Sequence, residues 1–266
     1  MTDTNTKPVL LVRATGNESD ASALAALGIA SVSEPYLSIN TVPGTEGYQA
    51  ATELLAKLTS LANGDWVIVT SANGLKHWGN LYGQSNLATA LAAAQDRGVR
   101  FAAIGDASAA MYSNLGIHSV LVSSAPYGRA LAREVLAASA GSAHQALIPT
   151  GNLAMAHLSE TLGQSEWSVT SVVVYLTSSV VNRPDSAAAV ADGDFLLVVL
   201  RSPSAARAMV EHAGIVPVPV ICGGNTTAET ARSLGLNVAA VAETTDSASM
   251  AQTVQRVLSE LNRGVA

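Results

Sequence analysis

The segment Asp65–Leu75, DWVIVTSANGL, is the stretch of sequence that most clearly indicates the fold. It joins a short apolar run, WVIV, to a turn of small polar residues and then to the start of a helical pattern. Four to seven apolar residues bounded by turn residues are typical of a strand buried in a parallel sheet. The segment returns in the second half of the chain as FLLVVLRSPSAA (195–206), where Ser202 corresponds to Ser71. A strand–turn–helix unit that is used twice predicts an α/β fold.

Two further pairs of segments repeat in the same order along the chain. Thr-Gly-Asn at 15–17 recurs at 150–152, and GDASAAMYSNLG (105–116) recurs as GNTTAETARSLG (224–235). The other runs that resemble buried strands are VLLV (9–12), RFAAI (100–104), QALI (145–148) and VPVIC (218–222). Repeated segments in one order indicate duplication, and strand–helix units in series form doubly wound sheets. The sequence therefore predicts two doubly wound parallel-sheet α/β domains that arose by internal duplication.

The composition excludes several classes of protein. The chain has 266 residues, of which 48% are apolar and 13% charged, so it has ample material for a packed core and is not disordered. The net charge is −6 and no basic run is present, which argues against nucleic-acid binding. The single cysteine excludes an internal disulfide, and the scattered histidines argue against a structural zinc site. No apolar run suits a signal peptide or a membrane span, so we expect a cytoplasmic protein.

The turns that follow the predicted strands are candidate anion-binding sites. In a doubly wound sheet, ligands bind beyond the carboxyl ends of the strands, where hydroxyls and helix N-termini favour negative charge. The same residue types are also ordinary helix N-caps, and capping alone is the alternative for each turn. The sequence has neither a dinucleotide fingerprint nor a phosphate-binding loop. The turns are Arg13–Asn17, Thr70–Asn73, Gly105–Ser108, Thr150–Asn152, Arg201–Ser204 and Gly224–Thr227.

Single residues outside these turns carry weaker signals. Cys222 lies in a strand-like run, where a buried inert thiol is the more frequent case. His77 lies on a helical stretch and is expected to be a surface or packing residue. Tyr175 lies in the long β-branched run Val169–Val181, which has the length and composition of an extended connector. It could face a cleft, although a tyrosine in such a run is more often a packing residue.

The order of these motifs resembles that of the uroporphyrinogen-III synthase family from about Val9 to Leu258. The residues that carry the resemblance are an arginine and Gly-Asn after the first strand, DWVIVTSAN, AAIG with SA, V-Y-x-T, S-P-S-A and GNTTA. The resemblance implies that residues 1–36 and 178–266 form one discontinuous α/β domain and 37–177 the other. It places connector strands near 34–39 and 170–178. The repeats alone would divide the chain once, near Ser142.

The resemblance also implies an activity. The family cyclises the linear tetrapyrrole hydroxymethylbilane to uroporphyrinogen III, with inversion of ring D and loss of water, in porphyrin and haem biosynthesis. The expected enzyme is a carbon–oxygen lyase (a cyclising hydro-lyase) that needs neither a metal nor an organic cofactor. We expect a cytoplasmic monomer whose partner is the small-molecule substrate, without nucleic acid or membrane, and which contacts the preceding enzyme of the pathway only transiently.

Site residues follow from the resemblance by motif. Tyr175 matches the tyrosine of V-Y-x-T, whose expected role is to hydrogen-bond the departing hydroxyl as donor or general acid. Two positions depart from the pattern: Ala14 stands where a proline is common, and Arg201 replaces a threonine and could anchor a carboxylate. The expected substrate-binding residues are Arg13, Thr70, Ser71, Ser108, Arg201, Ser202, Ser204, Thr226 and Thr227.

Two other functions remain open from the sequence. One is a non-catalytic module that binds or senses a tetrapyrrole or a small anion on the same duplicated scaffold, because one fold can host many functions. The other is a synthase that has lost its chemistry. Tyr175 in the connector, together with the paired Thr226 and Thr227, argues against a pure sensor, and the departures at Ala14 and Arg201 are the only signs of lost chemistry.

Overall fold

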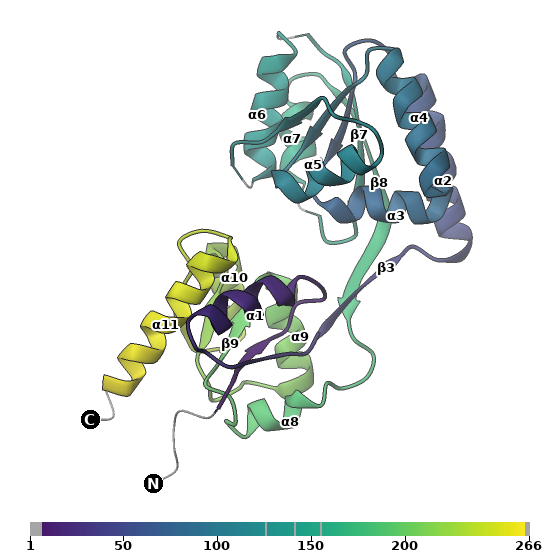
Figure 1. Ribbon diagram of the computed structural model, residues 1–266. Helices are drawn as coiled ribbons and strands as arrows, with labels where there is room; N and C mark the ends of the chain where they lie inside the picture. Colours follow the sequence, from purple (N-terminus) through teal and green to yellow (C-terminus); the bar gives the residue numbers. More distant parts are fainter. Residues whose placement is uncertain (1–6, 126, 141, 155, 264–266) are drawn as a thin grey trace. The chain divides into compact units, whose positions relative to one another are not determined.

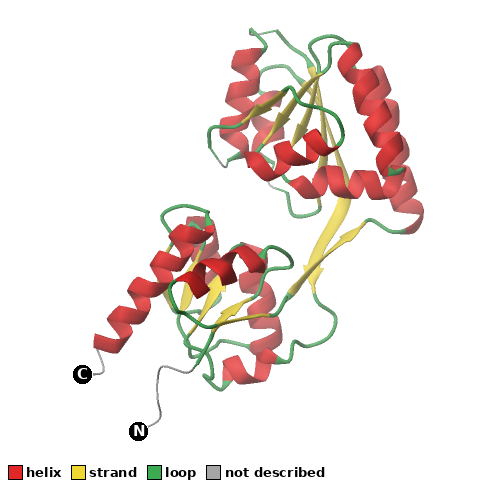
Figure 2. Ribbon diagram, in the orientation of Figure 1, coloured by secondary structure: helices red, strands yellow, loops and turns green. Residues whose placement is uncertain are grey.

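The chain folds into two compact units, which are described separately here (Figures 1 and 2). The computed structural model describes residues 7–125, 127–140, 142–154 and 156–263. Unit 1 is formed by residues within Met1–Ser38 and Ser178–Ala266, and unit 2 by Ile39–Thr177. Each unit contains one sheet with helices on both of its faces, so the predicted fold class is confirmed.

Unit 1 has a five-stranded parallel sheet in the order β11-β10-β9-β1-β2. Its strands are β1 (Val9–Leu11), β2 (Ser31–Ser33), β9 (Leu197–Leu200), β10 (Val220–Cys222) and β11 (Val238–Val241). Alternate side chains point to opposite faces: Leu10 packs with α8 (Ser186–Ala191), α9 (Pro203–Ala213) and α10 (Asn225–Ser233). Leu11 packs with α1 (Asn17–Ala26) and α11 (Ser247–Arg263). The central strands β1, β9 and β10 are apolar on both faces because both faces are covered.

Unit 2 has a six-stranded sheet in the order β3-β8-β7-β4-β5-β6. Its strands are β3 (Leu37–Thr41), β4 (Trp66–Val69), β5 (Arg100–Ala103), β6 (Val120–Val122), β7 (Gln145–Gly151) and β8 (Ser168–Ser179). The side chain of Val67 packs with α2 (Gly44–Ser60), α3 (Ala72–Tyr82), α4 (Gln84–Asp96) and α5 (Gly105–Asn114). Ile68 packs on the other face with α6 (Gly128–Ala138) and α7 (His157–Gly163).

The two sheets share one strand order, as internal duplication predicts. From β2, the unit 1 sheet runs β2-β1-β9-β10-β11, and from β8 the unit 2 sheet runs β8-β7-β4-β5-β6. The repeated segments occupy matching places: β4–α3 corresponds to β9–α9, α5 to α10, and the turn after β1 to the end of β7. The first strand–helix–strand unit of each half therefore lies in the sheet built by the other half. This exchange explains why the chain passes between the units twice.

Both passages are made by extended strands. Most of the run Val169–Val181 forms β8, which ends at Ser179, as its β-branched composition predicts. Val42 N–H donates to Val174 O, and Val180 N–H donates to Tyr36 O, so β3 and β8 run antiparallel. β3 begins at Leu37, after the expected start near residue 34, because Pro35 has no N–H to donate to a neighbouring strand. Within the described residues, no helix combines the length and apolar character needed to cross a membrane.

Candidate functional site

A cavity of about 370 Å³ lies at the carboxyl edge of the unit 2 sheet, the edge at which its parallel strands end. Its walls come from the turns after β4, β5 and β7, from the start of α6, and from β8. Ligand sites of doubly wound sheets lie at this edge, and the volume falls in the range of small-molecule sites. The residues that line it are Thr70, Ser71, Ile104, Tyr127, Gly128, Arg129, Leu153, Ala154, His157, Leu158, Tyr175 and Thr177.

Tyr175 presents its phenol to this cavity from β8. It lies opposite Gly151 of β7, where a Cβ would stand only 2.4 Å from Cε2 of the tyrosine ring. Glycine at 151 therefore leaves the space that the ring occupies. Burial raises the pKa of Tyr175, and a hydrogen bond with the Ser71 hydroxyl opposes the rise only in part. The phenol consequently keeps its proton at neutral pH and can donate a hydrogen bond.

The turn between β4 and α3 supplies two hydroxyls to the same cavity. Ser71 is the N-cap of α3, and its Oγ accepts a hydrogen bond from Asn73 N–H at 3.3 Å. Gly74 lets the start of this helix pack closely on β7, since a Cβ there would lie 2.6 Å from Pro149 O. For Ser71, capping and a place at the candidate site thus occur together. Thr70, Ser71 and Tyr175 are the predicted site residues that the structure brings to the cavity.

Four polar residues that line the cavity are not among the predicted site residues: Tyr127, Arg129, His157, and Thr177 of β8. Tyr127 is the N-cap residue of α6 and makes no side-chain capping bond, and Arg129 is exposed in the first turn of that helix. His157 opens α7, with Nδ1 3.7 Å from Oε2 of Glu160. The first two follow β6, a strand of only three residues, so their turn was not recognised. The run VLV followed by SSAPYG and a helical pattern was the signal that could have identified it.

Ser108 and Thr227 do not reach a ligand-accessible surface. They occupy matching places in the first turns of α5 and α10, and both side chains are buried. In both helices this position faces the interior of the unit, so these two hydroxyls are not exposed as the motifs lead one to expect. Thr226, the preceding residue, is exposed.

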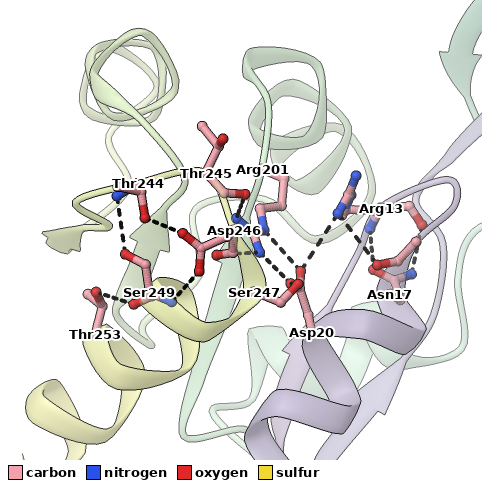
Figure 3. Close-up of polar contacts among 11 residues, drawn as sticks. Arg13, Asn17, Asp20, Arg201, Thr244, Thr245, Asp246, Ser247, Ser249 and Thr253 are labelled. Atoms are coloured by element: carbon pink, nitrogen blue, oxygen red, sulfur yellow. Dashed lines mark hydrogen bonds and ion pairs between the residues drawn. The ribbon is translucent and has the colours of Figure 1, made fainter. Parts of the chain in front are cut away.

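Arg201 forms an internal ion pair in unit 1 instead of a free anion anchor (Figure 3). Its Nε lies 2.9 Å from Oδ2 of Asp20, its Nη2 contacts Oδ1 of the same carboxylate, and Nη1 donates to Thr245 O at 3.0 Å. The side chains of Arg201 and Asp20 are 8% and 1% exposed. Burial raises the pKa of Asp20, but hydrogen bonds from Arg201 and Ser247 outweigh it and hold that pKa below its ordinary value. The carboxylate that Arg201 anchors therefore belongs to the chain itself.

Arg13 keeps part of its guanidinium accessible beside this pair. Its side chain is 38% exposed, and its Nη1 lies 3.9 Å from Oδ2 of Asp20 and donates to Gly16 O at 3.4 Å. Asn17 fixes the turn, since its Nδ2 donates to Arg13 O and its Oδ1 accepts from Arg13 N–H (Figure 3). Arg13 is thus a preorganised cation at the carboxyl edge of the unit 1 sheet.

The predicted residues Ser202 and Ser204 lie at the start of α9. Ser202 is the N-cap of α9, and its Oγ accepts from Ala205 N–H at 3.2 Å. The hydroxyls of Ser202 and Ser204 are 2.9 Å apart and hydrogen-bonded to each other.

Burial raises the pKa of Cys222 to about 11, so the thiol is inert, as its strand position indicated. Within the described ranges, no three His, Cys, Asp or Glu side chains cluster in a way that could hold a metal ion.

Comparison with known proteins identifies the family. The sequence model of the family described as "Uroporphyrinogen-III synthase HemD" matches residues 18–252. A mutant uroporphyrinogen III synthase from the extremely thermophilic bacterium Thermus thermophilus matches with a TM-score of 0.60 at 16% identity, over 95% of this chain and 99% of the other. Uroporphyrinogen-III synthetase from Helicobacter pylori also gives 0.60, at 13% identity, over 94% and 100%. No curated protein matches the sequence significantly. Because the family model covers most of the chain and the fold agrees, this protein belongs to the uroporphyrinogen-III synthase family.

Proposed function

We propose that the protein closes hydroxymethylbilane to uroporphyrinogen III, with Tyr175 as the group that assists loss of the substrate hydroxyl. Membership of the synthase family supports the overall reaction. The observation that supports the role of Tyr175 is a protonated phenol that lines a cavity at the carboxyl edge of a parallel sheet. We further propose that the enzyme is a cofactor-independent cyclising carbon–oxygen lyase that acts in the cytoplasm as a monomer.

The proposed step begins at the hydroxymethyl group of the substrate. The Tyr175 phenol donates its hydrogen bond to the hydroxyl oxygen while the carbon–oxygen bond breaks, and the oxygen leaves as water. The electron pair of the pyrrole nitrogen takes the place of the broken bond and gives an electrophilic azafulvene. Ring D attacks it through its substituted carbon, and the spiro intermediate fragments and recloses. The water carries away the phenol proton of Tyr175, and the proton that the carbon skeleton loses at closure returns to the Tyr175 oxygen.

The cavity fits one end of the substrate better than the whole of it. Sites of about 300–1,000 Å³ hold drug-sized ligands. A linear tetrapyrrole with four rings, each bearing acetate and propionate arms, is larger than a drug-sized ligand. The cavity measures about 370 Å³, near the lower end of this range. We therefore assign the cavity to the ring that carries the hydroxymethyl group. Ile104 and Leu153 offer apolar surface for the pyrrole face.

Carboxylate arms need donors and cations beside this apolar surface. In unit 2, Arg129 and His157 line the cavity together with the hydroxyls of Thr70 and Ser71. Charge-assisted hydrogen bonds from such groups are the stronger kind of contact to a carboxylate. In unit 1 we propose the part-exposed Arg13 and the exposed Thr226 as contacts to other arms. Because the linear substrate closes spontaneously to the symmetric type I isomer, holding it in position is the main task of the protein.

An isomer assay tests the proposal. The purified protein is given freshly generated hydroxymethylbilane, the products are oxidised, and type I and type III uroporphyrins are separated by chromatography. A dominant type III product is the expected result. If type I alone appears, at the spontaneous rate, the protein is not an active synthase, and a titration with tetrapyrroles then distinguishes a binding module from an inactive enzyme.

A further inference from the structure

We propose that His77 is a positioning residue that fixes the ring of Tyr175 at the cavity. The inference rests on the role proposed above for Tyr175. His77 lies on α3 and is 4% exposed. It is not among the residues that line the cavity, so it has no direct contact with a ligand there. Its effect on the reaction must therefore pass through a neighbour, and the ring of Tyr175 is that neighbour.

Two contacts restrict the Tyr175 ring. The imidazole of His77 lies against it, with ring centroids 5.3 Å apart and planes inclined by 31°. Gly151 adjoins the same ring so closely that a Cβ there would stand 2.5 Å from Cζ. A phenol confined between such neighbours loses little further freedom when it binds the departing hydroxyl. Preorganisation of this kind is what positions a catalytic group at low entropic cost.

His77 is itself held by a hydrogen bond with Thr41 of β3. Its Nδ1 lies 2.8 Å from the hydroxyl oxygen of Thr41, and Asn80 Nδ2 donates to the same oxygen at 3.2 Å. Asn80 occupies one lone pair of the Thr41 oxygen, and in the imidazole tautomer that carries its proton on Nε2 the Thr41 hydroxyl donates to Nδ1. Burial and the neighbouring Lys76 lower the pKa of His77, which agrees with a neutral ring that accepts at Nδ1. The imidazole orientation is thereby set.

Unit 1 contains a similar histidine that supplies a control. His212 lies on α9, the helix that corresponds to α3, with its ring 5.9 Å from that of Tyr36 and its Nε2 2.8 Å from Ser179 Oγ. The hydroxyl of Tyr36 is buried and bonded to Ser186 Oγ at 3.0 Å. A histidine–tyrosine contact with a connector hydroxyl therefore occurs in both units. Only the contact in unit 2 involves a tyrosine that lines the cavity.

The test is a double-mutant cycle on type III formation with His77→Ala and Tyr175→Phe. We expect His77→Ala to lower kcat about tenfold or more while KM changes less than threefold, because substrate contacts are retained. In the Tyr175→Phe background the same change should alter kcat less than twofold, since the hydroxyl that His77 positions is gone. His212→Ala, the matched control, should leave kcat within twofold of the parent.

Two further variants separate positioning from folding if His77→Ala does not fold. His77→Phe keeps a ring against Tyr175, and His77→Asn keeps a group that can bond Thr41 but removes the ring. We expect His77→Phe to retain more activity than His77→Asn. The inference is overturned if the order is reversed, if His77→Ala keeps the parent kcat, or if it lowers kcat equally in both backgrounds. If Tyr175→Phe alone keeps the parent kcat, the proposed role of Tyr175 is the part that fails.

Discussion

Gly151→Ala is the smallest change that tests whether the position of the Tyr175 ring controls the reaction. Gly151 does not have a positive φ, so its backbone conformation accepts alanine. The added methyl group would stand 2.4 Å from Cε2 and 2.9 Å from Oη of Tyr175. The change therefore acts on one side chain through contact alone, without altering the charge or the hydrogen-bonding groups of the site.

The size of the effect follows from these distances. Carbon atoms in contact are about 3.5–4.0 Å apart, so the ring has to move by more than about 1 Å to admit the methyl group. A displacement of about 1 Å at a reacting group can cost about 10²-fold in rate. We therefore expect kcat for type III formation to fall about 100-fold. Overpacking of this kind costs about 1–3 kcal/mol of folding free energy, which leaves most domains folded.

The assay compares initial rates of type III formation by chromatography, with thermal unfolding measured on the same preparations. Gly163→Ala is the matched control, because no atom lies within 4 Å of the Cβ it would add and its φ is not positive. It should keep the parent kcat. A Gly151→Ala protein that is folded and retains more than half of the parent kcat would refute the argument that the placement of Tyr175 limits the reaction.

Three other changes have defined outcomes. Tyr175→Phe should lower kcat while product-like tetrapyrroles bind with unchanged Kd in a titration, because only the donor to the departing hydroxyl is lost. Arg129→Gln should raise KM about tenfold at nearly constant kcat. A tenfold change is about 1.4 kcal/mol, close to the smallest contribution of a hydrogen bond to a charged group. An unchanged KM would show that Arg129 does not contact the substrate. Asp20→Asn should lower the free energy of unfolding by about 3 kcal/mol at pH 7 in denaturant titrations, because Arg201 is left buried without its countercharge. Since the pKa of Asp20 is depressed by folding, this difference should shrink as the pH falls below about 3.9, the ordinary pKa of aspartate; a constant difference down to pH 2 would contradict the pairing.

The central strands of both sheets could be predicted from the sequence because burial on both faces makes them continuous apolar runs. β4 and β9 are of this kind, and every residue in them is buried. The edge strands β2 and β6 could not be predicted in the same way. β2 is Ser-Val-Ser and has only one apolar residue, while β6 is an apolar run of only three residues, none of them fully buried. Pairing with a neighbouring strand, which is a tertiary interaction, defines them.

A site residue could be predicted from the sequence only where the turn that its motif identifies also lies at the cavity in the folded chain. Ser71 follows its strand directly and reaches the cavity from its capping position. Arg201 occupies the corresponding turn in unit 1, but Asp20, its partner, is 181 residues away in the sequence. Nothing in the turn itself indicates that pairing. Ser108 likewise stands in a typical binding turn, and the packing of its helix turns the hydroxyl inward.

The duplication produced two similar carboxyl edges, and residue differences at matching positions gave them different chemistry. Thr70 and Arg201 are such a pair, since Ser71 and Ser202 match in the repeat. At the unit 2 edge the small Thr70 side chain lines the cavity without filling it, so a ligand can approach the Tyr175 phenol. At the unit 1 edge the arginine fills the corresponding turn and is neutralised by Asp20, which leaves Arg13 as the accessible cation. A phenol donor at a cavity suits loss of a hydroxyl, whereas an accessible cation suits a carboxylate arm. We therefore expect changes at Tyr175 to act mainly on kcat, and changes at the cations Arg129 and Arg13 mainly on KM.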